Sequence, residues 1–373
     1  LVATVPGTVL TSYVNLGAVP EPNFAGNIMH ISDSYFNSDF WYRNEFEIPA
    51  EFLEDKTWLE FDGINWKADI FLNGKQVGRI DGAFMRGRFD ISEAAVPGKN
   101  YLAVRIIKNE HPGAAKEKDE QHTGRNGGEL GFDNPTFHAS IGWDWITTTR
   151  GRNIGIWNDV RVVREGSVSI DAPYVNVKLP LPDTTYVVLT PEALVKNNSD
   201  EPVRGTMKGK IGAIEFEQDI NLEAGQETLV KFETESFPQL VMQNPKLWWP
   251  AGMGDQYLYN IGVKADGQTL NKKVGIRTIE IGENLAFKVN GQKIFAKGAN
   301  WIPCDLDEAL HTPERYRDLL NSAKEANMNM IRLWGGGKFE KDAFYEICDE
   351  YGIMLFQEFC HSKSVVAAAL STK

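Results

Sequence analysis

Apolar and polar residues alternate in short runs along the first part of the chain, and such runs predict β-strands. Over residues 1–165 they include "FWYRNEFEIP", "TWLEFDGIN" and "NYLAVRII", which turn residues separate, and this predicts a jelly-roll-like β-sandwich. The pair Asn73-Gly74 stands between two alternating arms and predicts a hairpin, because both central residues of a type I′ turn need a positive φ. Residues 166–273 continue with about seven short strands, which favours a second, immunoglobulin-like sandwich.

Strands and helices alternate in residues 274–373. After a further hairpin signal at Asn290-Gly291, Thr312 and Pro313 predict the start of one helix and Gly352 the end of another. The apolar runs "NMNMIRLWGGG" and "IMLFQEF" predict parallel strands that are buried on both faces. The stretch after Phe359 supplies at most one weak helix, so we expect an α/β unit that is truncated or completed by something outside this chain.

The segment "NPKLWWPAGMG", Asn244 to Gly254, interrupts the strand pattern with aromatic residues and prolines. Proline removes a hydrogen bond from a sheet interior, so a central strand is a poor interpretation of this segment. We expect it to form a plug between two domains.

Charge and cysteine content narrow the classes of partner. Lys and Arg number 39 against 51 Asp and Glu, and the net charge of −12 argues against nucleic acid or an anionic membrane and favours a neutral ligand. No apolar run reaches the roughly 20 residues that span a bilayer. Cys304, Cys348 and Cys360 have no CxxC or zinc-like spacing, so we expect buried thiols, no metal and no cofactor. The first residue, Leu1, leaves open both a removed leader, which favours a periplasmic or extracellular location, and a fragment.

Several strings together resemble glycoside hydrolase family 2 over nearly the whole chain. They include "LEFDGINWKADIFLNGKQVG", "GWDW", "LWWPAGMGDQYLY", "FKVNGQKIFAKGANWIP", "MNMIRLWGGG" and "FYEICDEYGIMLFQEF". The strings "GANWIP" and "RLWGGG" are most similar to the branch with β-mannosidases and exo-β-glucosaminidases. β-Galactosidases and β-glucuronidases, the alternative within the family, usually carry a His-containing string where Trp334 stands.

The resemblance implies that residues 274–373 are the first three strands of a (β/α)8 TIM barrel. It also implies a retaining mechanism, in which a nucleophilic glutamate and an acid/base glutamate lie about 5 to 5.5 Å apart. In this family those glutamates end the fourth and seventh barrel strands, beyond the third strand reached here. No residue of this chain takes either catalytic role, and we expect the chain alone to be inactive.

The resemblance also implies that Asp144 of the first sandwich, with Trp143, binds hydroxyls of the terminal sugar. A carboxylate accepts hydroxyl hydrogen bonds, and an indole face packs against sugar C–H groups. In the alternative, the tryptophans fill a core between domains and Asp144 caps a turn or pairs with Arg150 or Arg152. Of these arginines, we expect Arg152 to hold its own loop.

Residues at the carboxyl ends of barrel strands are the remaining candidates, because TIM-barrel active sites lie on that face. These substrate-binding candidates are Asn300, Trp301, Arg332, Trp334 and Glu358. The resemblance places Arg332 against the nucleophile, whereas the alternative is a structural ion pair. It gives Glu358 a supporting role. We expect Asp305, Asp307 and Glu308 to be solvated loop residues.

Two functional hypotheses follow. The first is part of an exo-acting retaining β-glycosidase, of the β-mannosidase or exo-β-glucosaminidase type, whose partner is an oligosaccharide or glycoside substrate. The second is a carbohydrate-binding or structural fragment that works without hydrolysis. The sequence does not determine the sugar or the oligomeric state.

Overall fold

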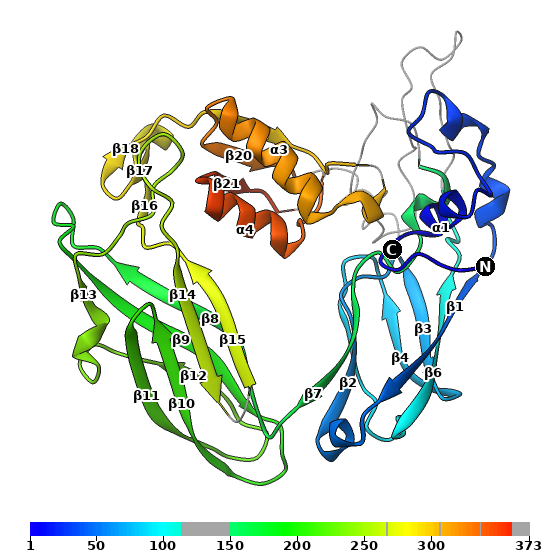
Figure 1. The fold of residues 1–373 in the computed structure, drawn as a ribbon, viewed down its shortest axis with the longest axis horizontal. Helices are drawn as coiled ribbons and strands as arrows, with labels where there is room; N and C mark the ends of the chain where they lie inside the picture. The colour runs from blue at the N-terminus through cyan, green and yellow to red at the C-terminus, as the bar shows by residue number, and fades with distance from the viewer. Residues whose placement is uncertain (113–148, 266–267, 306, 336, 360–373) are drawn as a thin grey trace.

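The computed structural model describes residues 1–112, 149–265, 268–305, 307–335 and 337–359. Two β-sandwiches follow one another along the chain, and a smaller α/β unit comes last (Figure 1). The α/β unit, orange and red in Figure 1, lies between the upper ends of the two sandwiches. The multidomain β-rich fold expected from the sequence is confirmed.

The first sandwich consists of two antiparallel sheets with strand orders β1-β6-β3-β4 and β5-β2-β7. Ile70, Val104 and Phe61 are fully buried between them, since alternate residues of each strand point inward. Asn73 and Gly74 have φ of 50° and 84° between β3 and β4, which confirms the predicted hairpin. The strands are β1 Phe40–Ile48, β2 Lys56–Phe61, β3 Lys67–Leu72, β4 Lys75–Asp81, β5 Gly87–Asp90, β6 Gly98–Ile107 and β7 Val160–Glu165.

Short helices precede and join these strands. Helix α1, Val9–Asn15, begins at a capping box in which the side chains of Thr8 and Thr11 each accept from the other's backbone N–H. The 3₁₀ helices of this part are η1 Asn27–His30, η2 Asp33–Phe36, η3 Ala50–Glu54 and η4 Arg150–Asn153.

The second sandwich packs the sheet β11-β10-β14-β15 against β12-β9-β13, to which β8 adds by pairing with β9. Its core includes Val187, Leu189, Val195 and Met207, all fully buried. The strands are β8 Val168–Lys178, β9 Tyr186–Asn197, β10 Val203–Ile211, β11 Ile214–Leu222, β12 Glu227–Lys231, β13 Val241–Gln243, β14 Tyr259–Ala265 and β15 Gln268–Val274, with η5 at Pro238–Leu240.

A small sheet and a tryptophan connect this sandwich to the α/β unit. The sheet contains β16 Ile279–Ile281, β17 Phe287–Val289 and β18 Gln292–Lys293, with η6 at Glu283–Leu285. Asn290 and Gly291 form its hairpin with φ of 49° and 76°. Trp248 is buried against Val289 and Met354, so the predicted plug between domains is confirmed.

The α/β unit is a parallel sheet of order β19-β20-β21 with one helix in each crossover. Thr312 caps α3 through its side chain, and Gly352 ends α4 in the left-handed conformation at φ 77°. This is the alternation with which a (β/α)8 barrel begins. The elements are β19 Gly298–Trp301, η7 Glu308–Leu310, α3 Pro313–Glu325, β20 Met330–Leu333, α4 Asp342–Tyr351 and β21 Met354–Gln357.

Candidate functional site

Three predicted site residues meet at the carboxyl ends of the parallel strands. The register of β19 and β20 places Asn300 beside Arg332, and Glu358 follows the last residue of β21. Carboxyl ends of parallel strands lie at one edge of a sheet, which is where barrel enzymes place their active sites. The sheet geometry therefore brings together residues that are far apart in the sequence.

Arg332 holds this group together. Its Nε donates to Glu358 Oε1 at 2.7 Å, and its Nη2 contacts the same oxygen. Its Nη1 donates to Asn300 Oδ1 at 2.9 Å, which fixes the orientation of that amide. The Asn300 side-chain NH₂ is then left to donate elsewhere, because no described residue accepts from it.

Glu358 is held as a carboxylate. The backbone N–H of Gly335 donates to its Oε2 at 2.7 Å, and this bond, together with the Arg332 guanidinium, lowers the pKa of Glu358. A Cβ at position 335 would lie 2.9 Å from that carboxylate oxygen and equally close to the backbone carbonyl of Phe359, so the close approach favours glycine. Glu358 accordingly acts as a hydrogen-bond acceptor that positions Arg332, and it is unsuited to donating a proton.

The two predicted tryptophans of this edge have different surroundings. Trp301 neighbours Asn300 on β19, and successive strand residues point to opposite faces. Its indole packs 4.8 Å from the ring of Phe344 on α4, and its Nε1 donates to Glu340 Oε1 at 3.0 Å. Trp334 directly follows β20 and is half-buried, and its carbonyl accepts from the Gly337 N–H at 2.9 Å in a turn. The Trp301 side chain thus lies on the helix-facing side of the sheet.

Two carboxylates that we expected to be solvated are buried, so that expectation is wrong. Glu308 is 1% exposed, and its carboxylate pairs with the equally buried Lys338. Asp307 is 7% exposed and accepts from Thr11 Oγ1 at 2.9 and 2.7 Å. Neither contact is predictable from a local sequence pattern, because each partner lies in a distant segment of the chain. The nearest signal in the sequence is the position of Lys338, a charged residue directly after the glycine-rich string, between an apolar strand and a helix.

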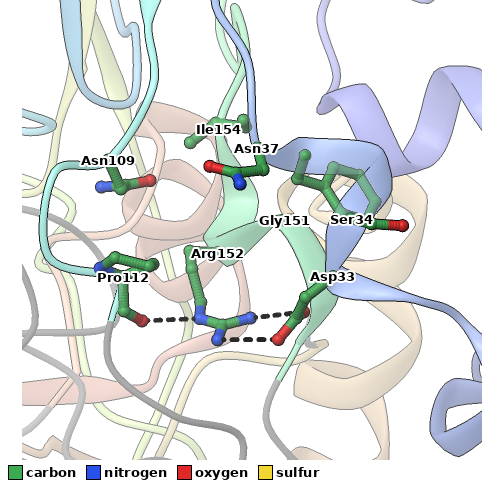
Figure 2. Close-up of a pocket in the computed structure, with 9 residues that line it drawn as sticks. Asp33, Ser34, Asn37, Asn109, Pro112, Gly151, Arg152 and Ile154 are labelled. Atoms are coloured by element: carbon green, nitrogen blue, oxygen red, sulfur yellow. Dashed lines mark hydrogen bonds and ion pairs between the residues drawn. The ribbon is translucent and has the colours of Figure 1, made fainter.

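The predicted contribution of the first sandwich falls on Trp143 and Asp144, which lie outside the described residues. Arg152, close after them in the chain, binds both Asp33 oxygens through Nη1 at 3.0 Å and Nη2 at 3.3 Å (Figure 2). Its Nε donates to the Pro112 carbonyl at 2.9 Å. These residues line a pocket of about 230 Å³. Arg152 therefore holds its loop, as expected.

Cysteines and metal ligands add no further chemistry among the described residues. Cys348 is buried and Cys304 partly buried, both are free thiols, and burial raises the pKa of Cys304 to about 12. Cys360 lies outside the described residues. Within the described part, no group of three or more His, Cys, Asp and Glu residues is placed to hold a metal ion, and no helix has the length and apolarity to cross a membrane.

Comparison with known families identifies the fold. A family model described as "Glycosyl hydrolase 2 galactose-binding domain-like" matches residues 1–158, and one described as "Glycosyl hydrolases family 2" matches residues 168–277. The chain belongs to glycoside hydrolase family 2. The predicted resemblance is confirmed, and the two matches cover both sandwiches.

Relatives of the chain are β-mannosidases and exo-β-glucosaminidases. A mannosylglycoprotein endo-β-mannosidase of Lilium longiflorum is 34% identical over 96% of this chain and 39% of its own. An exo-β-D-glucosaminidase of Streptomyces avermitilis is 31% identical over 93% of this chain and 36% of its own. The crystal structure of a β-D-mannosidase from Dictyoglomus thermophilum is 30% identical, with a TM-score of 0.75, over 96% of this chain and 45% of its own. The chain thus spans less than half the length of each of these relatives.

Proposed function

We propose that this chain is the amino-terminal part of an exo-acting, retaining β-glycosidase of the β-mannosidase or exo-β-glucosaminidase type. The observation that supports it most is the group of Arg332, Glu358 and Asn300 at the carboxyl ends of three parallel strands. Relatives named for both activities match nearly all of the chain. One of them is named an endo-enzyme, so exo action is part of the proposal.

In this proposal Arg332 supplies a fixed positive charge at the sugar site. After its contacts with Glu358 and Asn300, the guanidinium retains N–H groups on both terminal nitrogens. A guanidinium beside a carboxylate favours the ionised form of that carboxylate, which is the form a nucleophile needs. Glu358 and Asn300 together keep the guanidinium in place and fix its orientation.

The sugar itself meets polar and aromatic groups of this edge. The Asn300 NH₂ donates to a hydroxyl, and the face of Trp334 packs against the C–H groups of the ring. From the first sandwich, the Asp144 carboxylate accepts hydrogen bonds from sugar hydroxyls, and the indole of Trp143 packs against the sugar. Trp301, on the helix-facing side, supports the edge through Glu340 and does not contact the sugar.

Hydrolysis requires two further carboxylates, a nucleophile and an acid/base. The proposal assigns neither to this chain: the lowered pKa of Glu358 makes it a poor acid/base, and the three hydrogen bonds to its two oxygens leave it poorly placed to attack as a nucleophile. A chain without either catalytic carboxylate is also what the second candidate function requires, in which the chain binds carbohydrate without cleaving it.

Hydrolysis of p-nitrophenyl β-mannoside, β-glucosaminide and β-galactoside tests the proposal. The 373-residue chain is assayed beside a longer chain that continues through the rest of a barrel. We expect activity only in the longer chain. The preferred sugar identifies the branch, because the 2-amino group of glucosamine needs an acidic partner, whereas the axial 2-hydroxyl of mannose needs a hydrogen-bond acceptor or donor. Activity in the shorter chain contradicts the assignment of both catalytic carboxylates to other strands. An inactive longer chain that still binds sugar supports the second candidate.

A further inference from the structure

A buried cluster of charged side chains lies behind the candidate site. We call Glu308, His311, Lys338 and Glu340 the Lys338 cluster. The side chains of Glu308, Lys338 and Glu340 are 2%, 1% and 1% exposed, and that of His311 is fully buried. Burial of charges is costly unless they are paired and hydrogen-bonded, so a cluster of this kind persists only in a closely defined geometry.

The cluster ties together the loops that follow the first two parallel strands. Glu308 belongs to the loop after β19, whereas Lys338 and Glu340 belong to the loop after β20. The Lys338 ammonium contacts Glu308 and lies 3.9 Å from Glu340 Oε2. His311 Nδ1 faces the two carboxylates at 3.6 and 3.7 Å. One cation therefore bridges both loops.

Hydrogen bonds extend the cluster to the strand, the helix and the first sandwich. Trp301 on β19 and Tyr316 on α3 each donate to one oxygen of Glu340, at 3.0 and 2.6 Å. The Lys338 ammonium lies 5.2 Å above the ring of Trp157 in the first sandwich. Asp307, beside Glu308, binds Thr11 of the same sandwich. Strand, helix, both loops and a neighbouring domain thus converge on one buried ammonium.

The cluster is close in the chain to the site that it supports. Lys338 comes three residues after Gly335, whose N–H donates to Glu358, and the turn closed by Gly337 joins them. We infer that Lys338 is a positioning residue: by holding both loops it fixes the Gly335 N–H, and through it the orientation of Glu358 and Arg332. The inference rests on the proposed function for calling this edge a sugar site, but its geometry stands independently of the sugar.

Amide hydrogen exchange at Gly335 tests the inference in the 373-residue chain. In Lys338→Met the two carboxylates keep no ammonium between them, and we expect the Gly335 N–H to exchange at least about tenfold faster. Lys297→Met is the matched control, because it removes the same charge from an exposed position directly before β19; there we expect a change within about twofold. Amides of the second sandwich report whether the whole chain has been destabilised.

A second variant keeps the test decisive if Lys338→Met folds poorly. Glu308→Leu with Lys338→Met removes both members of the closest pair, and Glu340 retains its hydrogen bonds from Trp301 and Tyr316. We expect this double variant to fold more stably than Lys338→Met, since apolar replacement of a buried ion pair is commonly tolerated, but to leave the Gly335 N–H poorly protected, because no cation bridges the two loops. Gly335 protection restored to the wild-type level contradicts the inference.

The pH profile separates positioning by charge from simple loss of packing. The groups that face or surround the ammonium are Glu308, Glu340, His311, Tyr316, Cys304 and Lys341. Burial raises the pKa of Glu340 and the Lys338 ammonium lowers it, so that pKa should rise in Lys338→Met; lowering the pH from 7 to about 5 then neutralises more of the Glu340 carboxylate than in wild type, and Gly335 protection should rise relative to wild type. An effect independent of pH, or one shared equally by the second sandwich, overturns the inference. Because no sugar is used, the result is separate from the success or failure of the proposed function.

Discussion

Replacement of Trp248 by alanine should uncouple the α/β unit from the second sandwich. Trp248 is 1% exposed and packs against Val289, Ile294 and Met354. Its Nε1 donates at 2.7 Å to the carbonyl of Asp349, in the last turn of α4, where helix carbonyls have no partner within the helix. The side chain therefore fills a core and satisfies a helix end at the same time.

The magnitude follows from these two roles. Truncation of a fully buried tryptophan to alanine costs about 3 to 5 kcal/mol of unfolding free energy. Trp248→Phe keeps most of the ring but leaves the Asp349 carbonyl without its donor, which costs about 1 to 3 kcal/mol. Trp41→Ala is the control, because Trp41 is 57% exposed in the first sandwich; we expect about 1 kcal/mol or less.

Urea denaturation, followed by hydrogen exchange and mass spectrometry, measures the change in stability of each domain separately. Separate values are necessary because a multidomain chain need not unfold in one step. We expect Trp248→Ala to lower the stability of α3, α4 and the parallel sheet and to leave the first sandwich unchanged. If Trp248→Ala destabilises the α/β unit no more than Trp41→Ala does, Trp248 is not the plug that the structure indicates.

Three further outcomes are expected. Burial raises the pKa of Glu340, but Lys338, with contacts from His311 and Tyr316, outweighs burial and holds that pKa at about 2, against 4.5 for an ordinary glutamate. The stabilisation from the Glu340 carboxylate is therefore present above about pH 4.5 and is lost as the pH falls toward 2; Glu340→Gln should flatten that part of a urea-midpoint profile, and an unchanged profile contradicts the ion pairing. Gly74→Ala, at φ 84° with open space around it, should cost about 1 to 2 kcal/mol in thermal unfolding, whereas Gly26→Ala, also in open space at φ −99°, should cost little. Asp307→Ala should lower stability by about 1 to 3 kcal/mol and speed proteolysis of its loop, and a neutral effect would show that the bond to the first sandwich adds nothing.

Features encoded locally are predictable from this sequence. Asn73-Gly74 and Asn290-Gly291 determine their hairpins because few residues tolerate a positive φ, and Thr312 and Gly352 mark helix ends for equally local reasons. The strand ends that carry Arg332 and Glu358 were also found, because apolar runs mark the parallel strands.

Contacts between distant segments were not predictable in the same way. The pairing of Glu308 with Lys338 spans 30 residues, and that of Asp307 with Thr11 spans 296, so no local pattern shows that these carboxylates are buried. The alternation of side chains along a strand does predict that Asn300 and Trp301 point to opposite faces of the sheet, and this could have been inferred from the sequence. The roles of Trp143 and Asp144 stay predictions, since both lie outside the described residues.

The catalytic efficiency of an Arg332→Met variant tests the central claim most directly. In the longer chain, kcat/KM for the preferred p-nitrophenyl glycoside is compared with that of Arg315→Met, an exposed arginine of α3. We expect Arg332→Met to lose at least about 100-fold, or about 2.7 kcal/mol of transition-state stabilisation, and Arg315→Met to stay within about twofold of wild type. If Arg332→Met retains full activity, the group at the carboxyl ends of the three strands is a structural ion pair and not the edge of the sugar site.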